Sequence, residues 1–283
     1  MQPDKKANQT LKLLFAVGAV LIPLVVPSGS HAADAASGSV AEPAFDPARF
    51  EPSSADGAVW SLIVGAGALY APEYEGSRGF KVSPLPAVIF TYGDWLTLDP
   101  RGISVTAFTH QGFSLAGKVG YEMGRDEDDG DRLKGLGDID FAATIGARAT
   151  YRWEALELYA EVDQTVGGSE SLIGKFGAEY TAPVTDRFFV SAGISATVAN
   201  EEHMQSYFGV TAAQSAASGL RAFKPQASLK RVDFSVSATY MATENWLMRG
   251  EVGMGALLGD AADSPIVERE LQPSFMAIVG YKF

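Results

Sequence analysis

Long segments in which apolar and polar residues alternate are the feature that most constrains the fold of this chain. In DRFFVSAGISATVA, apolar residues from Phe188 to Val198 fall on one face, while serine, threonine and glycine fall on the other. The segments RVDFSVSATY and NWLMRGEVGMGALL repeat this pattern around Phe234 and Val252. Because successive side chains of a β-strand point to opposite faces, a period of two predicts strands.

The length of the alternating segments favours a membrane barrel over a soluble sandwich. A fourth segment, DIDFAATIGARATY, is expected to form a strand that includes Ile139 and continues to Tyr151. The segments run for about 10–14 residues, whereas strands of globular proteins are usually about 5–6 residues long. A tilted strand needs about 9–11 residues to cross a bilayer. We therefore expect the apolar faces to meet lipid and the polar faces to line a lumen.

The connections between segments fall into two classes that match the two ends of a barrel. TYGDW, THQGF, YRWEA, APVTD and MATEN are short, whereas the connections after Glu122, Ala199 and Leu258 are long and carry most of the charge. Outer-membrane barrels have short periplasmic turns and longer extracellular loops. The sequence therefore predicts an all-β, transmembrane, antiparallel up-and-down β-barrel over residues 57–283.

The predicted barrel has about twelve strands, and ten is the alternative count. An even number returns both ends of the barrel to the periplasm. The spans near residues 94 and 102 are short, and Pro84 and Pro86 cannot donate the hydrogen bonds of a ladder. The strands are expected to begin near residues 58, 79, 94, 102, 113, 138, 155, 171, 186, 226, 245 and 273.

The N-terminal region has the composition of a secretory signal. Three lysines precede the apolar run LLFAVGAVLIPLVV, and small residues lead to a cut after Ala32, with Ala35 as a second candidate. The run falls short of the ~20 residues that a membrane helix needs, and Pro23 interrupts it. Residues 1–32 are therefore predicted to be a cleaved signal peptide, and residues 33–56 a flexible periplasmic leader rich in Ala, Ser and Pro.

Aromatic residues near the short turns predict where the barrel meets the periplasmic interface. Amphipathic rings form girdles at membrane interfaces. The segment FMAIVGYKF is predicted to be the closing strand, with Phe275 facing lipid. Its terminal aromatic is similar to the C-terminal signal that the outer-membrane insertion machinery recognises. The expected periplasmic girdle comprises Trp60, Trp95, Trp153, Trp246 and Phe283.

Charge and residue types exclude several classes of function. The formal net charge is −12, and nucleic acid is an unexpected partner because phosphate binding needs clustered Lys and Arg. The cysteine count is 0, so the chain has no disulfide framework, thiolate chemistry or Cys-based metal site. No cofactor and no metal site are expected.

Charged residues on the polar faces of the strands form the candidate lumen site. Unpaired buried charge is costly, and acids and bases are mixed on most strands, so a network of ion pairs that fills a narrow lumen is favoured. A charged pore or a solute site is the alternative. The candidate residues are Lys118, Glu122, Arg148, Glu157, Glu161, Lys175, Glu179, Arg231, Asp233, Arg249 and Glu251.

Catalytic chemistry has little support in the sequence. After signal cleavage the histidines are His110, in a short turn, and His203, in a long loop, so they cannot share a site. A Ser206–His203 pair for acyl hydrolysis is conceivable. Such a pair also needs a residue that orients the histidine and a pocket for the oxyanion, and no sequence motif indicates either. A solvated loop histidine is therefore the preferred interpretation. The run RDEDDGDR lacks the spacing of a calcium loop and is interpreted as a solvated outer loop.

Several long phrases of the sequence are unlike generic barrel sequence. They are YAPEYEGSRGFKVSPLPAVIF, GLGDID, SYFGVTAAQSAASGL, LLGDAADSPIV and the closing YKF. From about residue 57 to 283 the chain resembles the MltA-interacting protein family, also called MipA/OmpV. The motif positions, interpreted as loop residues, are Tyr74, Gly76, Pro84, Pro86, Tyr207, Phe208, Gly209, Ser218, Gly219, Leu220, Gly259, Asp260, Asp263, Ser264 and Pro265.

The resemblance implies an outer-membrane protein of a Gram-negative bacterium, without catalytic residues or cofactors. The founding member is described as a scaffold that joins a lytic transglycosylase to a peptidoglycan synthase, so these enzymes are the implied partners, beside lipid and lipopolysaccharide. A scaffold would present its contacts to the periplasm, whereas the motif phrases fall in the predicted outer loops. A small channel, a solute-binding barrel or an adhesin-type surface protein is the alternative function.

Overall fold

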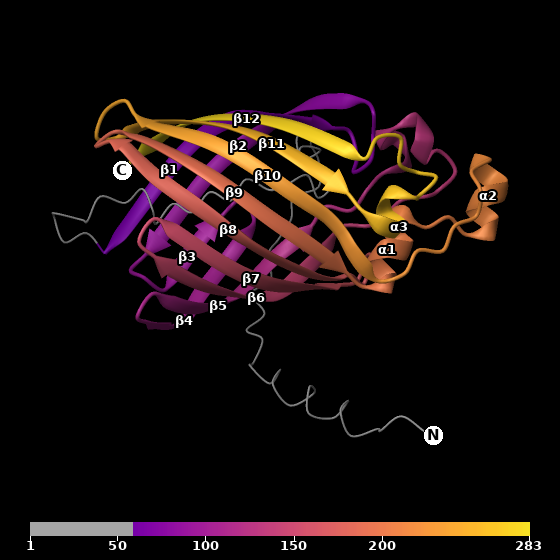
Figure 1. Ribbon diagram of the computed structural model, residues 1–283, viewed down its shortest axis with the longest axis horizontal. Helices are drawn as coiled ribbons and strands as arrows, with labels where there is room; N and C mark the ends of the chain where they lie inside the picture. Colours follow the sequence, from indigo (N-terminus) through magenta and orange to yellow (C-terminus); the bar gives the residue numbers. More distant parts are fainter. Residues whose placement is uncertain (1–58) are drawn as a thin grey trace, which may run out of the picture. The chain divides into compact units, whose positions relative to one another are not determined.

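The computed structural model describes residues 59–283, which form a closed antiparallel barrel (Figure 1). Each strand pairs with its neighbours in the chain, and β12 pairs with β1 to close the barrel. The strands are β1 Trp60–Pro72, β2 Phe80–Tyr92, β3 Leu96–Asp99, β4 Gly102–His110, β5 Phe113–Glu122, β6 Ala142–Trp153, β7 Leu156–Val166, β8 Leu172–Thr185, β9 Phe188–Ala199, β10 Ser228–Met241, β11 Trp246–Leu257 and β12 Leu271–Lys282.

The predicted up-and-down barrel of twelve strands is confirmed, and the ten-strand alternative is wrong. The spans that looked weakest in sequence are indeed short, since β3 has only 4 residues and β4 has 9. One predicted boundary is wrong, because β6 begins at Ala142 and not near residue 138. Ile139 instead forms an isolated bridge with Arg125, which folds the segment before β6 back over the barrel mouth.

The barrel wall is apolar on its outer face, as the alternation predicts. Phe234 on β10 and Val252 on β11 are 53% and 57% exposed, and Phe275 on β12 is 51% exposed. The intervening residues, such as Ser237 and Met276, are buried toward the interior. Apolar side chains of this size are exposed in such numbers only where a nonaqueous environment covers them. Among residues 59–283, no helix combines the length and apolar character needed to cross a membrane.

The two ends of the barrel differ, and we call them the turn end and the loop end (Figure 1). The turn end holds Trp60, Phe283 and the connections 93–95, 111–112, 154–155, 186–187 and 242–245. The loop end holds the connections 73–79, 123–141, 167–171, 200–227 and 258–270.

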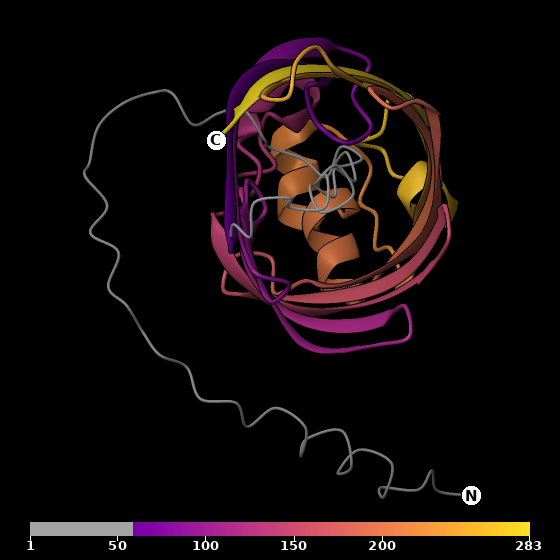
Figure 2. The same cartoon turned by 90° about the vertical axis from the view of Figure 1, so that its left-hand side faces the viewer.

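Short helices form in the loop-end connections because their first residues carry capping side chains. Helix α1, Glu201–Phe208, starts after Asn200, whose side chain accepts a hydrogen bond from the His203 amide. Helix α2, Ala212–Ser218, starts at a capping box formed by Thr211 and Gln214. Such caps satisfy amide donors that a helix start otherwise leaves unpaired. Seen down the barrel, these helices lie within the ring of strands (Figure 2).

The remaining short elements also lie at the loop end. They are the 3-10 turns η4, Glu127–Asp129, and η5, Asp131–Leu133, and the helix α3, Gly259–Ala262.

Candidate functional site

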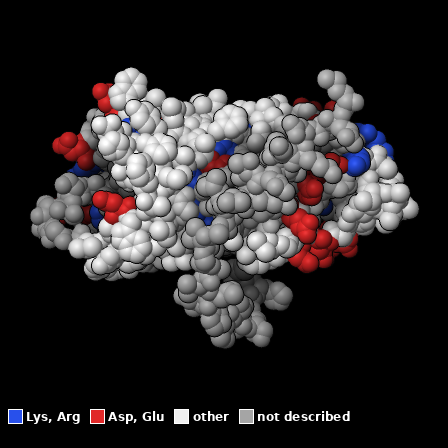
Figure 3. Space-filling view, turned by 90° about the horizontal axis from the view of Figure 1, so that it is seen from below, with Lys and Arg blue, Asp and Glu red and all other residues white. Residues whose placement is uncertain are grey.

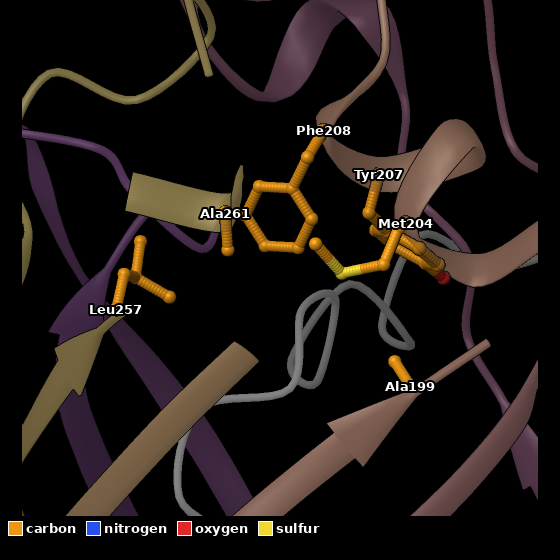
Figure 4. Packing of buried hydrophobic residues seen from close by; sticks show 6 residues of the cluster. All are labelled: Ala199, Met204, Tyr207, Phe208, Leu257 and Ala261. Atoms are coloured by element: carbon orange, nitrogen blue, oxygen red, sulfur yellow. The ribbon is translucent and has the colours of Figure 1, made fainter. Parts of the chain in front are cut away.

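Four loops fold together over the mouth of the barrel, and we call the connections 73–79, 123–141, 200–227 and 258–270 the cap. Its inner layer packs α1 and α3 onto the ends of β9 and β11 (Figure 4). The buried side chains of this layer are Ala199, Met204, Tyr207, Phe208, Leu257 and Ala261.

A second apolar cluster joins all four loops of the cap. It contains Tyr74, Leu133, Leu136, Val210 and Ile266, each at most 5% exposed. The Tyr74 hydroxyl donates to the backbone carbonyl of Ile266 at 3.3 Å. Burial, reinforced by the nearby Glu268 carboxylate, raises the pKa of Tyr74 above its usual range. A cluster drawn from four separate loops holds them as one packed unit.

Hydrogen bonds across the loops add directional contacts to this packing. Ser264 Oγ donates to the Phe208 carbonyl at 2.6 Å, and the Arg125 guanidinium donates to the Tyr207 carbonyl at 2.8 Å. Gln214 Nε2 donates to the carbonyl of Leu136 at 2.6 Å. Because buried carbonyls need donors, these bonds fix the relative positions of the loops.

A chain of buried polar groups runs beneath the cap. Lys230 Nζ lies 2.9 Å from Glu75 Oε2 and 3.0 Å from His203 Nε2. On its other side, His203 Nδ1 lies 2.8 Å from Ser171 Oγ. Ser169 adjoins Ser171 through their hydroxyls and donates to Glu122 at 2.8 Å.

This polar chain is closed to bulk water. His203, Lys230 and Ser171 are at most 1% exposed, and Glu75 is 6% exposed. Burial, followed by the charge of Lys230, holds the pKa of His203 well below its ordinary range. A neutral imidazole can accept one hydrogen bond and donate the other, which suits a position between an ammonium and a hydroxyl.

Tyr207 forms the lid of this polar chain. Its ring stacks on the His203 ring with centroids 4.6 Å apart. Burial, together with the Glu122 carboxylate that accepts its hydrogen bond, raises the pKa of the Tyr207 hydroxyl above its usual range. The tyrosine therefore stays neutral and donates.

The charged residues predicted for the lumen lie on inward positions, and many of them are in contact. Arg231 pairs with Asp233 at 2.6 Å and with Glu75 at 3.4 Å. Arg249 pairs with Glu251 at 2.8 Å. These pairs are almost fully buried.

A second group of lumen charges crosses from β5 to β7. Lys118 contacts Glu161 at 3.3 Å and Asp163 at 2.8 Å. Arg148 contacts Glu157 and Glu161, both at 3.1 Å. Of the remaining candidates, Lys175 and Glu179 on β8 are half-buried, and Glu122 contacts the polar chain beneath the cap.

The structure corrects two features of the predicted loops. His203 is buried and not solvated, because α1 turns its ring inward. Its serine neighbour is Ser171 from a different loop, and not Ser206. Spacing along the chain could not reveal this contact, since 32 residues separate the two. The acidic run lies in a loop-end connection with Asp126, Asp128 and Asp131 exposed, as expected of a solvated outer loop, and Glu127 accepts hydrogen bonds from the Gly135 and Gly137 amides.

Most of the family-motif residues meet in the cap. Tyr207, Phe208 and Gly209 end α1, Ser218, Gly219 and Leu220 end α2, and Gly259, Asp260, Asp263, Ser264 and Pro265 form the loop around α3.

Gly76 shows why one of these motif positions lacks a side chain. It has a φ of 100°, and a Cβ there would lie 2.6 Å from Val267 Cγ2. Pro84 and Pro86 are exceptions to the loop interpretation, because both lie in β2.

The aromatic residues predicted for the girdle all lie at the turn end. Trp60, Trp95, Trp153, Trp246 and Phe283 are each at least 47% exposed. Tyr281 packs edge-on against both Trp246 and Phe283.

Comparison with protein families gives one match. The family described as MltA-interacting protein MipA matches residues 64–283. The chain belongs to this family. Together with the closed barrel and its apolar outer wall, membership in the MipA family supports an outer-membrane β-barrel. No curated protein sequence matches this MipA-family chain significantly.

Two solved structures that resemble this MipA-family barrel are outer-membrane proteins of low sequence identity. The NanC porin is 7% identical, with a TM-score of 0.43, and the match covers 78% of this chain and 100% of that one. An outer membrane channel of Pseudomonas putida F1, COG4313, is 11% identical, with a TM-score of 0.41 and coverage of 82% and 98%. These likenesses are too distant to indicate a shared activity.

Proposed function

We propose that this chain is a non-enzymatic scaffold of the Gram-negative outer membrane that holds murein-remodelling enzymes at the periplasmic face. The proposal rests on the packed cap, which occupies the opposite end of the barrel. Packed loops occupy the loop end, and the lumen charges pair with each other, so the turn end offers the surface for a protein partner. The MipA family is described by its interaction with MltA, which supports a murein enzyme as that partner.

The turn end carries exposed acidic residues in four of its turns, with Arg187 exposed beside one of them, and we propose that these acids meet basic groups of the partner. Asp94, Glu154, Asp186 and Glu244 are exposed, and each lies in a different turn. Complementary charge speeds association and fixes orientation more than it adds affinity. We propose that a lytic transglycosylase docks here and that a peptidoglycan synthase joins the same assembly.

We propose that the predicted leader is a second docking element for the periplasmic partner. Residues 33–56, like the signal peptide of residues 1–32, lie outside the described residues.

The test is retention of the folded, detergent-solubilised barrel on an immobilised lytic transglycosylase from the same cell. Reversal of the four turn-end acids to lysine is expected to weaken retention about tenfold at low salt. The matched control reverses four exposed loop-end acids, Asp131, Asp140, Glu202 and Glu270. Equal binding by wild type and both variants would contradict the proposed surface, and no binding by folded wild type would contradict the scaffold.

A small channel is the second candidate, favoured by the charged residues that line the lumen. Arg148 and Lys118 contact three acids, Glu157, Glu161 and Asp163. A lumen wall that carries both signs of charge in this way could line a route for polar solutes. Planar-bilayer conductance no higher than the lipid baseline would remove this candidate. A conductance that rises when the cap is loosened would favour it over the scaffold.

A further inference from the structure

A cleft opens at the loop end where three loops of the cap meet. It has a volume of about 490 Å³, within the range of pockets that hold small molecules. Figure 3 shows acidic and basic side chains gathered at the loop end, on the right, beside a barrel wall that is mostly uncharged. We call this opening the loop cleft, and its charged lining consists of Glu73, Arg78, Asp131, Arg132 and Glu268.

Contacts among the three loops hold the charged groups of the loop cleft in place. The Glu268 amide donates to the Gly76 carbonyl at 2.8 Å, which joins the 258–270 loop to the 73–79 loop. Arg132 Nε donates to the Pro265 carbonyl at 2.9 Å, which joins the 123–141 loop to the same 258–270 loop. The buried Tyr74 hydroxyl lies 3.3 Å from Glu268 Oε2. Because the loops are fixed to one another, we expect the cleft to keep its shape.

Two glycines give the Glu73 carboxylate its place in the loop cleft. A Cβ at Gly79 would collide with this carboxylate. A Cβ at Gly130 would lie 2.7 Å from Tyr74 Cε1 and 3.9 Å from Glu73 Oε2. Side chains at these two positions would fill the space that Glu73 and Tyr74 border, so the glycines leave the Glu73 carboxylate room to line the cleft.

The charges of the loop cleft are only partly paired. Arg78 lies near Glu268, with a nitrogen–oxygen distance of 3.7 Å, but the Arg78 side chain is 73% exposed. Arg132 uses its Nε for a backbone carbonyl, and within residues 59–283 its terminal nitrogens have no further hydrogen bond or ion pair. Likewise, the part of the chain that the structure describes offers the Glu73 carboxylate no hydrogen-bond donor and no ion-pair partner. Glu73 and Arg132 therefore remain available to a ligand.

The mixture of charges narrows the class of ligand. In residues 59–283 no group of three or more acidic or histidine side chains is arranged to hold a metal ion, although three acids line the cleft. A purely anionic ligand would meet Glu73 and Asp131, and a purely cationic one would meet Arg78 and Arg132. An uncharged ligand would displace water from these groups without replacing its contacts, which costs free energy. A ligand with one charge of each sign offers a partner to both kinds of group.

We propose that the loop cleft binds a short peptide with free ends, its ammonium at the Glu73 carboxylate and its carboxylate at the Arg132 guanidinium. A guanidinium matches a carboxylate through two parallel hydrogen bonds, and an ammonium donates to a carboxylate in a charge-assisted bond. The volume of about 490 Å³ exceeds what a single small amino acid fills, and a peptide separates its two charges further. This inference is independent of the scaffold proposal, because the loop cleft lies at the opposite end of the barrel from the turns.

The test is a ligand-detected NMR titration of the full chain, folded in detergent micelles, with glycylglycine as the probe. N-acetylglycylglycine lacks the ammonium, and glycylglycinamide lacks the carboxylate. Each is expected to bind about tenfold more weakly than glycylglycine, since each loses one charge-assisted contact. Glycine is the comparison for ligand length, and binding of glycine as tight as that of glycylglycine would overturn the assignment to a peptide.

Two variants assign each end of the peptide to its residue. Glu73→Gln is expected to weaken glycylglycine binding about tenfold but to leave N-acetylglycylglycine binding unchanged, because that compound has no ammonium to lose. Arg132→Gln is expected to weaken glycylglycine binding about tenfold but to leave glycylglycinamide binding unchanged, and Arg132→Lys, which keeps the charge, should recover part of the binding. The matched controls Glu244→Gln and Arg187→Gln, exposed at the turn end, should bind glycylglycine as the wild type does.

The shift of gel migration on heating checks that each variant has folded. Equal binding of glycylglycine and its two blocked derivatives by the folded wild type would overturn recognition by charge. No binding of glycylglycine by the folded wild type, or unchanged binding by both Glu73→Gln and Arg132→Gln, would overturn the site.

Discussion

The ammonium group of Lys230 lies 2.9 Å from a carboxylate oxygen of Glu75, although 155 residues separate the two. Their side chains are 1% and 3% exposed. Lys230 belongs to β10 and Glu75 to the β1–β2 loop, so the contact ties the cap to the barrel wall. His203 of α1 contacts Lys230, and Arg231 of β10 contacts Glu75, so the same pair also adjoins α1.

Removal of one charge from this pair is expected to loosen the cap. Glu75→Gln leaves the Lys230 ammonium buried beside a neutral amide, and breaking a buried pair typically costs about 3–5 kcal/mol. The measurement is hydrogen exchange of α1 amides in detergent micelles, with intact strand protection as evidence of a folded barrel.

An exposed ion pair provides the matched control. Lys224 contacts Glu201 at 2.9 Å, but the two side chains are 73% and 45% exposed. Pairs of this kind contribute about 0–1 kcal/mol, so Glu201→Gln is expected to change α1 exchange little. A similar effect of both substitutions would contradict the importance of burial at Glu75.

The cap is expected to weaken in mild acid. The folded-state pKa of His203 lies below its unfolded value of about 6.5, so the opened state binds a proton that the closed state does not. The contribution of neutral His203 to the stability of the closed cap is therefore fully present above about pH 6.5. It is lost as pH falls toward the pKa that His203 has in the folded protein. The opening equilibrium should rise up to about tenfold per pH unit, measured by proteolysis of the cap between pH 7.5 and pH 5.

The groups around His203 define the control. Lys230, Ser171 and Tyr207 contact its ring, and Glu75 lies beyond Lys230. His203→Gln retains a polar side chain without a titrating proton, so its cap should open with a flatter pH dependence. His110→Gln, at the exposed end of β4, should keep the wild-type slope, and a flat wild-type profile would refute the assignment.

The barrel could be predicted from sequence because its signal is local. Alternation fixes which face of each strand is apolar, and a slip of one residue would turn Phe234 and Val252 inward. The closing strand was predictable from Phe275 for the same reason. The wrong start of β6 has a nonlocal cause, since the pairing of Ile139 with Arg125 overrides a local alternating pattern.

The site was less accessible to sequence analysis because tertiary packing creates it. Mixed charges indicated lumen pairs, and Arg231 with Asp233 or Arg249 with Glu251 could be expected from their spacing on one strand. The burial of His203 depends on the cap, which is assembled from loops far apart in the chain. Met204, Tyr207 and Phe208 have the i, i+3, i+4 spacing of an apolar helix face, and this spacing inside a supposedly solvated loop was the signal that could have indicated it.

Packing within the inner cluster of the cap should be sensitive to lost volume. Phe208 is 0% exposed and packs among Met204, Leu257 and Ala261. Phe208→Ala is expected to destabilise the cap by about 3–5 kcal/mol through lost burial and a residual cavity. Met204→Leu conserves volume and should cost less than about 1.5 kcal/mol. The same amide-exchange measurement compares them, and equal effects would argue against tight packing.

The Arg249–Glu251 pair tests whether each buried charge of the lumen is stabilised mainly by its ion-pair partner. The side chains are 3% and 9% exposed and their charged atoms are 2.8 Å apart. Arg249→Met alone leaves the Glu251 carboxylate buried without its cation, which should cost about 3–5 kcal/mol, whereas the double replacement of Arg249 and Glu251 by methionine should cost less. Urea unfolding of the micelle-bound barrel, followed by its heat-shifted gel migration, measures both. A double variant less stable than the single one would mean that Glu251 serves another partner and not Arg249.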